Sequence, residues 1–126
     1  MRAAEQSSMS ILVAADEDSL RFVLREALVA DGHRVSEVSD GESALDSLSS
    51  DQFDLAFLDI RMPGCSGLDV LERLRAAGSD TPVVIITAQN TMDNAVEAMK
   101  RGALDYLLKP FSLAQGSALT ERARST

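Results

Sequence analysis

Residues 53–67 read FDLAFLDIRMPGCSG, and this stretch decides the fold. It contains a short apolar run, residues 55–58, which is followed at once by an acidic residue, Asp59. A continuous apolar run of this length is typical of a strand that is buried on both faces of a parallel sheet. The residues Met62, Pro63 and Gly64 then favour a turn. The stretch therefore predicts a central strand that ends at an aspartate beside a turn.

Similar strand-like runs recur on both sides of this stretch, roughly every 20 to 30 residues. The segments between them have helical periodicity, for example the apolar stripe formed by Leu20, Leu24 and Leu28. Alternating strands and helices predict a parallel sheet that is covered by helices on both faces. The run 34–38 has polar residues at its centre, so we expect it at an edge of the sheet. The predicted strands are 11–15, 34–38, 53–58, 83–87 and 106–108.

Composition narrows the classes of function. The chain has 126 residues, which suits one domain. Its net charge of −8 opposes direct binding to nucleic acid. With one His, one Cys and no Trp, most metal-cluster and thiol chemistries are excluded. No apolar run approaches the roughly 20 residues of a membrane helix, and the polar start MRAAEQSS is no signal peptide. We therefore expect a cytoplasmic protein that does not bind a membrane.

Polar residues collect at the ends of the predicted strands. Asp16 and Glu17 follow the first strand, Asp59 ends the third, Thr87 ends the fourth and Lys109 follows the fifth. Because the carboxyl ends of parallel strands share one edge of the sheet, these side chains are expected to converge there. A carboxylate can act as a nucleophile, Mg²⁺ binds through one or two carboxylates, and lysine and threonine can hold phosphoryl oxygens. The set therefore indicates phosphoryl transfer.

Three strings of this sequence resemble segments of bacterial response-regulator receiver domains. FDLAFLDIRMPGCSG (53–67) resembles their phosphoacceptor segment, VVIITAQ (83–89) their Thr segment and DYLLKPF (105–111) their Lys-Pro segment. The strings occur in the order found in the family, and the resemblance covers about residues 11–111. It implies an α/β, flavodoxin-like fold of five βα units, with a doubly wound parallel five-stranded sheet in the strand order 2-1-3-4-5.

The resemblance also assigns roles to the residues at the strand ends. It implies that Asp59 is the phosphoacceptor and that Thr87 and Lys109 hold the phosphoryl oxygens. Mg²⁺ would be bound by Asp16, by Asp59 and by the backbone carbonyl of Arg61.

Two further features belong to the expected switch. Tyr106 would be the aromatic residue whose rotamer responds to movement of Thr87. The peptide bond between Lys109 and Pro110 is typically cis in this family.

One position departs from the family pattern. Receiver domains usually carry two adjacent acidic residues after the first strand, and this chain has Ala15 followed by Asp16. Shifting the alignment to pair Asp16 with Glu17 would spoil the spacing to Arg21, which matches the family when Asp16 is the second acid. Ala15 therefore stands where the first acid is expected, which should weaken Mg²⁺ binding and slow phosphoryl transfer.

The resemblance implies a signalling switch and not an enzyme. A sensor histidine kinase would phosphorylate Asp59, and the face formed by the fourth helix, fifth strand and fifth helix would respond. That face would regulate an output domain or a partner protein, or would form a homodimer. The segment TMDNAVEAMKRG (91–102) most resembles receivers of sigma-54-dependent, nitrogen-regulatory transcription activators. Transcription control is therefore the expected output.

The same pattern predicts three parts of the chain. We expect a disordered extension over residues 1–9 and a receiver domain over residues 10–115. Residues 116–126 would be the end of the last helix or a C-terminal tail.

Other functions are compatible with parts of the pattern. A pseudo-receiver, which binds partners without being phosphorylated, is supported by Ala15 alone. A flavodoxin-like enzyme or nucleotide binder would share the fold, but neither GxxxxGK[ST] nor GxGxxG is present. A haloacid-dehalogenase-type phosphatase would need an aspartate where this chain has Arg61.

Three residues are expected to be passive. Glu17 is interpreted as a surface acid, His33 as a solvent-exposed residue of a turn, and Cys65 as an ordinary loop thiol.

Overall fold

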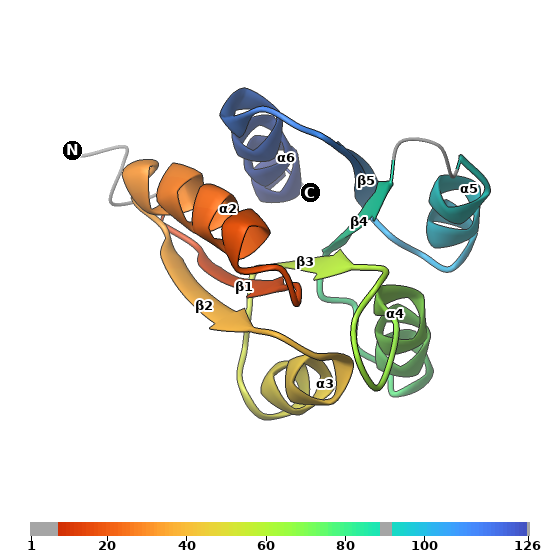
Figure 1. The fold of residues 1–126 in the computed structure, drawn as a ribbon. Coiled ribbons are helices and arrows are strands. Elements are labelled where there is room, and N and C mark those ends of the chain that lie inside the picture. Colours follow the sequence, from red (N-terminus) through yellow and green to blue (C-terminus); the bar gives the residue numbers. More distant parts are fainter. Residues whose placement is uncertain (1–7, 89–91, 126) are drawn as a thin grey trace.

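Strands and helices alternate along the whole folded chain (Figure 1). The computed structural model describes residues 8–88 and 92–125. The strands are β1 (Ser10–Ala14), β2 (Arg34–Val38), β3 (Leu55–Asp59), β4 (Val83–Ala88) and β5 (Asp105–Lys109). The helices are α2 (Asp18–Ala30), α3 (Gly41–Ser50), α4 (Gly67–Ala76), α5 (Met92–Lys100) and α6 (Leu113–Ser125). None of the helices in the described ranges has the length and apolar character needed to cross a membrane.

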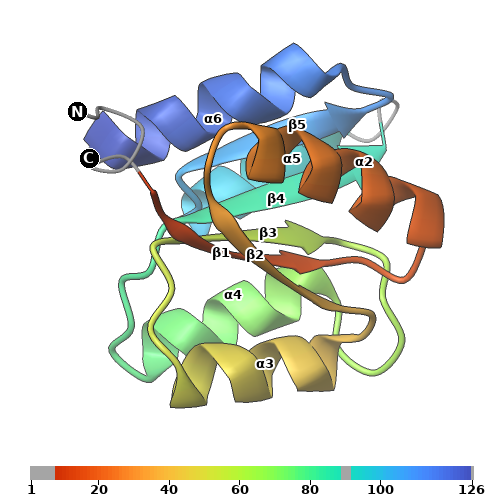
Figure 2. The same cartoon turned by 90° about the vertical axis from the view of Figure 1, so that its left-hand side faces the viewer.

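The strands form one parallel sheet in the order β2-β1-β3-β4-β5. Helices α2 and α6 cover one face, and α3, α4 and α5 cover the other (Figure 1); Figure 2 shows the layer of α3 and α4 below the sheet. Each face has its own apolar cluster, with Leu24, Leu28 and Leu119 in one and Leu48, Val70 and Leu71 in the other. The predicted α/β fold and strand order are confirmed.

Burial follows the hydrophobic pattern of each strand. All five residues of β3 are buried, whereas β2 at the edge of the sheet has no fully buried residue. Complete burial of a side chain such as Phe57 or Leu58 stabilises the fold by about 1.5–3 kcal/mol relative to leaving it exposed. The stable centre of the sheet therefore carries Asp59 at its carboxyl end.

The ends of the chain differ in part from the expected division. Met9 is 7% exposed and packs in the core, although the expected disordered extension included it. Residues 1–7 lie outside the described part of the chain. At the other end, α6 runs on through Gly116 to Ser125 and packs against α2. Leu24 of α2 approaches Gly116 so closely that a Cβ there would lie 3.2 Å from it.

Two of the three residues expected to be passive are buried. His33 is 5% exposed, and its Nδ1 accepts a hydrogen bond of 3.0 Å from the Met9 N–H. The prediction that His33 is solvent-exposed is therefore wrong, because the turn after α2 folds this ring under the start of β1. Cys65 lies in a loop as expected, but it is 5% exposed and its thiol donates to Glu42 at 3.3 Å.

Candidate functional site

Asp59 lies at the carboxyl end of the central strand and faces a small pocket. The residue is only 1% exposed, and it pairs in register with Ile86 of β4. The pocket has a volume of about 160 Å³. It is lined by Asp59, Ile60, Arg61, Thr87, Ala88, Asn94 and Lys109. The strand ends of β3, β4 and β5 therefore converge as the sequence predicts.

The carboxylate of Asp59 is held by a cation and by a backbone amide. The Lys109 ammonium donates to Oδ2 at 3.0 Å, and the Arg61 N–H donates to Oδ1 at 3.2 Å. Burial raises the pKa of Asp59 above its ordinary value, although the hydrogen bond and charge of Lys109 oppose this shift. The site thus keeps a buried carboxylate next to a lysine, an arrangement that carries a desolvation cost.

Lys109 contacts a second carboxylate besides Asp59. Its Nζ lies 3.4 Å from Oε1 of Glu17, the residue just before α2. Burial by itself lowers the pKa of Lys109, but the hydrogen bond and charge of Asp59, together with Glu17, raise it overall. Glu17 was interpreted as a surface acid, and its side chain is indeed 59% exposed. No sequence pattern indicated its contact with a residue 92 positions away.

The loop after Asp59 folds back beneath it. The Gly67 N–H donates to the Ile60 carbonyl at 3.1 Å, and Ser66 caps α4 by accepting from the Asp69 N–H at 3.1 Å. A Cβ at position 67 would lie 2.5 Å from the Asp59 carbonyl oxygen, so only glycine fits this close approach. The loop 60–66 is thereby fixed against the end of β3, with Arg61 at the pocket.

The two residues expected to form the switch, Thr87 and Tyr106, line two different pockets. Thr87 is 2% exposed and lines the Asp59 pocket. Tyr106 is half-buried on β5, where it pairs in register with Ile85, and it lines another pocket of about 400 Å³. That pocket also contains Val96 and Met99 of α5, which are 50% and 41% exposed. The peptide bond between Lys109 and Pro110 is cis.

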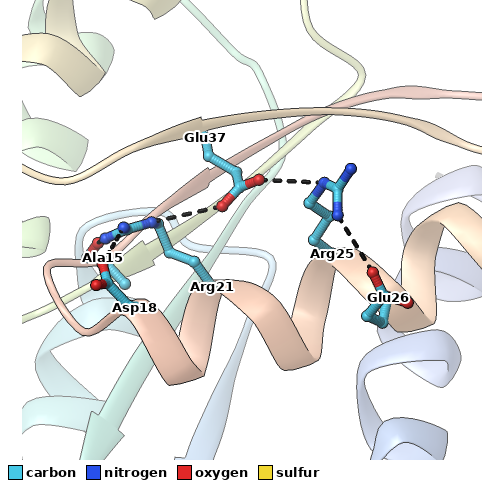
Figure 3. A network of polar contacts seen from close by, with 6 residues as sticks. All are labelled: Ala15, Asp18, Arg21, Arg25, Glu26 and Glu37. Atoms are coloured by element: carbon cyan, nitrogen blue, oxygen red, sulfur yellow. Dashed lines mark hydrogen bonds and ion pairs between the residues drawn. The ribbon is translucent and has the colours of Figure 1, made fainter.

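An arginine occupies the corner next to Ala15 (Figure 3). Ala15 is fully buried and extends the backbone pairing of β1 by donating to the Val38 carbonyl at 3.1 Å. The Arg21 guanidinium donates to the Ala15 carbonyl at 2.6 Å and also pairs with Asp18 and with Glu37. The turn that carries Asp16 and Glu17 is therefore tied to the first turn of α2.

The residues expected to bind Mg²⁺ are brought together only in part. Asp59 and Arg61 line the same pocket, but Asp16 is exposed and does not line it. Within residues 8–88 and 92–125, no group of three or more acidic, histidine or cysteine side chains is placed to hold a metal ion. The oxygen donors that remain still suit Mg²⁺, which binds through one or two carboxylates and completes its shell with water and phosphate oxygens.

Asn94 is a pocket residue that the sequence reasoning missed. It comes from the first turn of α5, and its side chain is half-buried at the pocket that Asp59 lines. A single polar residue on a helix gives no sequence signal for such a role. The N–H groups of its side-chain amide can donate hydrogen bonds to an oxyanion.

Comparisons with known proteins agree on one family. The family model described as "Response regulator receiver domain" matches residues 11–121. DNA-binding transcriptional regulator NtrC of Escherichia coli (strain K12) is 40% identical over 115 residues, which are 91% of this chain and 24% of that protein. Response regulator MprA of Mycobacterium tuberculosis (strain ATCC 25177 / H37Ra) is 41% identical over 106 residues, 84% of this chain and 46% of that protein.

Solved structures of receiver domains have the same fold. The receiver domain of NtrX from Brucella abortus matches with a TM-score of 0.86 and 34% identity, covering 92% of this chain and 98% of that one. The BeF3-activated receiver domain of nitrogen regulatory protein C matches with a TM-score of 0.80 and 39% identity, covering 94% of this chain and 95% of that one. The chain spans less than half the length of the two curated relatives.

Proposed function

Because this chain belongs to the family of response regulator receiver domains, we propose that it is a phosphorylation-dependent switch with Asp59 as the phosphoacceptor. The observation that carries the proposal is the buried Asp59 carboxylate with Lys109 at 3.0 Å, in a pocket that Thr87 also lines. A buried carboxylate with a raised pKa is costly to the fold, and such groups concentrate at functional sites. The donor would be a phosphorylated histidine of a sensor kinase.

The residues of the pocket supply what the transfer requires. One oxygen of Asp59 attacks phosphorus and forms the new P–O bond. The bond between phosphorus and the donor nitrogen breaks at the same time, and the nitrogen keeps the electron pair. Lys109 and the Thr87 hydroxyl then bind the phosphoryl oxygens, which carry the negative charge. The pairing of Lys109 with Asp59 before transfer favours the ionised, nucleophilic form of the carboxylate.

Mg²⁺ would be bound by Asp59, by Asp16 and by the backbone carbonyl of Arg61. When bound, the ion neutralises charge on the phosphoryl oxygens and the acceptor carboxylate. Ala15 removes the acid expected beside Asp16, so we propose weak Mg²⁺ binding and slow phosphorylation. The same residues serve autodephosphorylation, and we propose no other reaction for the chain.

The response would pass from Thr87 to the face formed by α5, β5 and α6. Tyr106 lines the apolar pocket together with Val96 and Met99, and it lies on the strand that ends at Lys109, so a change of its rotamer would alter that surface. Phosphorylation would shift the population of two conformers of this face, and would thereby change its affinity for a partner or for a second copy of the chain. This part of the proposal rests on the position of Tyr106.

The output is proposed to be transcription control. NtrC and MprA are described as a DNA-binding transcriptional regulator and a response regulator, and both are more than twice as long as the matched segment. An output domain on the same polypeptide, or a separate partner protein, would then be the target of the switch. The chain itself carries a net charge of −8, so DNA contacts would come from that other domain. A cytoplasmic location, which keeps Cys65 reduced, fits this scheme.

Labelling by a small phosphodonor tests the proposal. With Mg²⁺ and acetyl phosphate, intact-mass analysis should show one phosphoryl group on the chain and none on Asp59→Asn. Asp54→Asn is the matched control, because Asp54 precedes the same strand and its replacement retains an acceptor for the Ser10 N–H. Asp54→Asn should be labelled like the parent chain. A label on a serine, threonine or histidine would refute the assignment of Asp59.

Ala15 keeps a second candidate function open. It is fully buried where the family has an acid, and the described residues hold no three-carboxylate group at the pocket. A pseudo-receiver that binds partners without phosphorylation would have these features. Absence of any label on the parent chain, with labelling restored by Ala15→Asp, would favour this alternative.

A further inference from the structure

Glu17 contacts the lysine of the phosphoacceptor pocket, although neither the sequence nor the family match assigns it a role. Its Oε1 lies 3.4 Å from Lys109 Nζ, and the same Nζ lies 3.0 Å from Asp59 Oδ2. The ammonium therefore has two carboxylate partners, one nearly completely buried and one mostly exposed. The side chains of Asp59 and Glu17 are 2% and 59% exposed.

The local structure leaves the Glu17 side chain available for this contact. Glu17 is the N-cap residue of α2, but its side chain makes no capping hydrogen bond. The turn is held instead by Arg21, which donates to the Ala15 carbonyl and pairs with Asp18. Because the backbone of this turn is fixed by other groups, the carboxylate of Glu17 reaches across the sheet edge from β1 to β5.

A divalent cation at Asp59 would compete with Lys109 for the same carboxylate. Because two cations at one carboxylate repel each other, the approach of the metal ion weakens the contact between Lys109 and Asp59. Without a second counterion, a lysine that moves away from Asp59 would keep an unpaired charge in a partly buried position, since the Lys109 side chain is 27% exposed. Glu17 offers a second counterion within the reach of the same side chain.

We propose that Glu17 is a positioning residue, the second counterion of Lys109, and that it sets how readily Lys109 leaves Asp59 when a divalent cation arrives. Glu17 also supplies a negative charge beside Lys109, in a region where Ala15 replaces the acidic residue usual in the family. This inference rests on the proposed function, because it takes Asp59 as the shared ligand of Lys109 and the metal ion.

The test compares two neutralised acids that are adjacent in the sequence. Glu17→Gln removes the second counterion, and it should weaken Mg²⁺ binding by about threefold, the size expected of a mostly exposed ion pair. Asp18→Asn is the matched control, since its side chain is 92% exposed and contacts Arg21 and not Lys109. It should change the Mg²⁺ affinity by less than about 1.5-fold, because an exposed charge is screened. Both affinities can be measured by following amide NMR shifts in a Mg²⁺ titration.

The same titration in a Lys109→Ala background identifies the path of the effect. If Glu17 acts through Lys109, Glu17→Gln should lose its extra effect there and should match Asp18→Asn. An undiminished effect in that background would mean that Glu17 acts only through its charge on the metal ion, and would overturn the proposal. Equal effects of the two substitutions in the parent chain would overturn it as well.

Failure of the inference and failure of the proposed function give different results. Labelling of Asp59 together with equal Mg²⁺ affinities of Glu17→Gln and Asp18→Asn refutes only the role of Glu17. No label and no Mg²⁺ binding refute the proposed function and, with it, the role of Glu17 as the second counterion of Lys109. Urea unfolding without metal measures the contact between Glu17 and Lys109 directly. The four chains compared are the parent, Glu17→Gln, Lys109→Ala and the double variant. The Glu17→Gln substitution should lower the free energy of unfolding less when the lysine is absent, and equal losses in the two backgrounds would refute the contact.

Discussion

Two aspartates flank the central strand, and they have opposite environments. Asp54 precedes β3, is exposed, and accepts a hydrogen bond of 2.8 Å from the Ser10 N–H. Asp59 ends β3, is 1% exposed, and pairs with Lys109. The pocket at the Asp54 edge of the sheet has a volume of about 570 Å³, and the pocket at the Asp59 edge about 160 Å³. Neither residue type nor pocket size therefore identifies the candidate site.

Burial next to a cation is what separates the two edges. The carboxylate of Asp54 contributes to the fold by joining the start of β3 to β1, and it lies at the surface. The carboxylate of Asp59 loses hydration on burial, and this raises its pKa. Keeping it ionised at neutral pH therefore lowers the stability of the fold. A fold retains such a cost where it serves a function. Three kinds of substitution test this difference between the two edges. They remove the cation, restore the missing acid, or neutralise each aspartate in turn.

Removing the cation is expected to have the largest effect. Lys109→Ala should leave Mg²⁺ binding intact or slightly tighter, because a competing positive charge leaves the Asp59 carboxylate. Phosphorylation should nevertheless produce no conformational response, since no ammonium remains to draw in the phosphoryl oxygen. Amide NMR shifts around Tyr106, recorded before and after phosphorylation, measure this response. A full response in Lys109→Ala would contradict the role given to Lys109.

Restoring the missing acid should have the next largest effect. Ala15→Asp is expected to tighten Mg²⁺ binding about tenfold, or about 1.4 kcal/mol, which is typical of a supporting group at a metal site. The metal-free variant should be less stable than the parent, because Ala15 is fully buried and the new carboxylate must be desolvated near Asp16 and Asp59. Arg21, which donates to the Ala15 carbonyl, offsets a part of this loss.

Mg²⁺ titration and thermal melts of parent and Ala15→Asp check both parts of this prediction. The substitution Ala30→Asp, at the exposed end of α2, is the control for adding one negative charge away from the pocket. Equal Mg²⁺ affinities of parent and Ala15→Asp would show that position 15 does not serve the metal ion.

The strand ends were predictable from the sequence, whereas the contacts between distant side chains were not. The continuous apolar runs 55–58 and 83–86 placed β3 and β4 inside the sheet, and the polar residues after them therefore had to meet at one edge. Periodicity gives burial along one element, but it does not show how far a side chain reaches. The contact of Glu17 with Lys109 depends on that reach, and so does the place of Asn94 at the pocket.

His33 shows the same limit at the opposite edge of the sheet. The sequence Asp31–Gly32–His33 has the composition of an exposed turn, and the structure does place a positive φ of 93° at Gly32. The turn directs the ring of His33 inward, because its Nδ1 accepts the Met9 N–H that no strand partner satisfies. Turn composition predicts the backbone path and leaves the side-chain direction open.

Neutralising each of the two aspartates should change stability in different ways. Asp59 has a raised pKa in the folded state, so the unfolded chain releases its proton more readily and the charged form disfavours folding at neutral pH. Asp59→Asn should therefore raise the free energy of unfolding at pH 7, because the neutral amide avoids the desolvation cost of the carboxylate, its oxygen can still accept from Lys109, and Glu17 remains beside that ammonium. Asp54→Asn retains an acceptor for Ser10 and should change it by less than about 0.5 kcal/mol. Urea unfolding of the three chains gives the comparison, and a less stable Asp59→Asn would contradict it.

The smallest expected effect concerns His33, which lies near Asp54 at the edge of the sheet opposite the Asp59 pocket. Its Nδ1 accepts from Met9, so the neutral ring carries its proton on Nε2, which is buried and has no hydrogen-bond partner within the described residues. Protonation would place a second N–H against the Met9 N–H. Burial lowers the pKa of His33, and the charge of Arg124 lowers it further. The carboxylates that oppose this shift are Asp31, Glu121 and Asp54.

The lowered pKa fixes the sign of a pH dependence. Between the folded and the unfolded pKa of His33, the unfolded chain binds more protons than the folded chain, so stability rises with pH. The contribution of His33 is therefore complete above the unfolded value of about 6.5 and is lost as the pH falls below it. His33→Asn retains an acceptor for Met9 but cannot titrate. We expect the parent to lose stability relative to His33→Asn as the pH falls. Urea unfolding of both chains from about pH 5 to pH 8 measures the difference in their free energies of unfolding. Subtracting the two curves removes the carboxylate titrations that both chains share. A difference that does not depend on pH would mean that the buried ring titrates with the same pKa in the folded and unfolded chain.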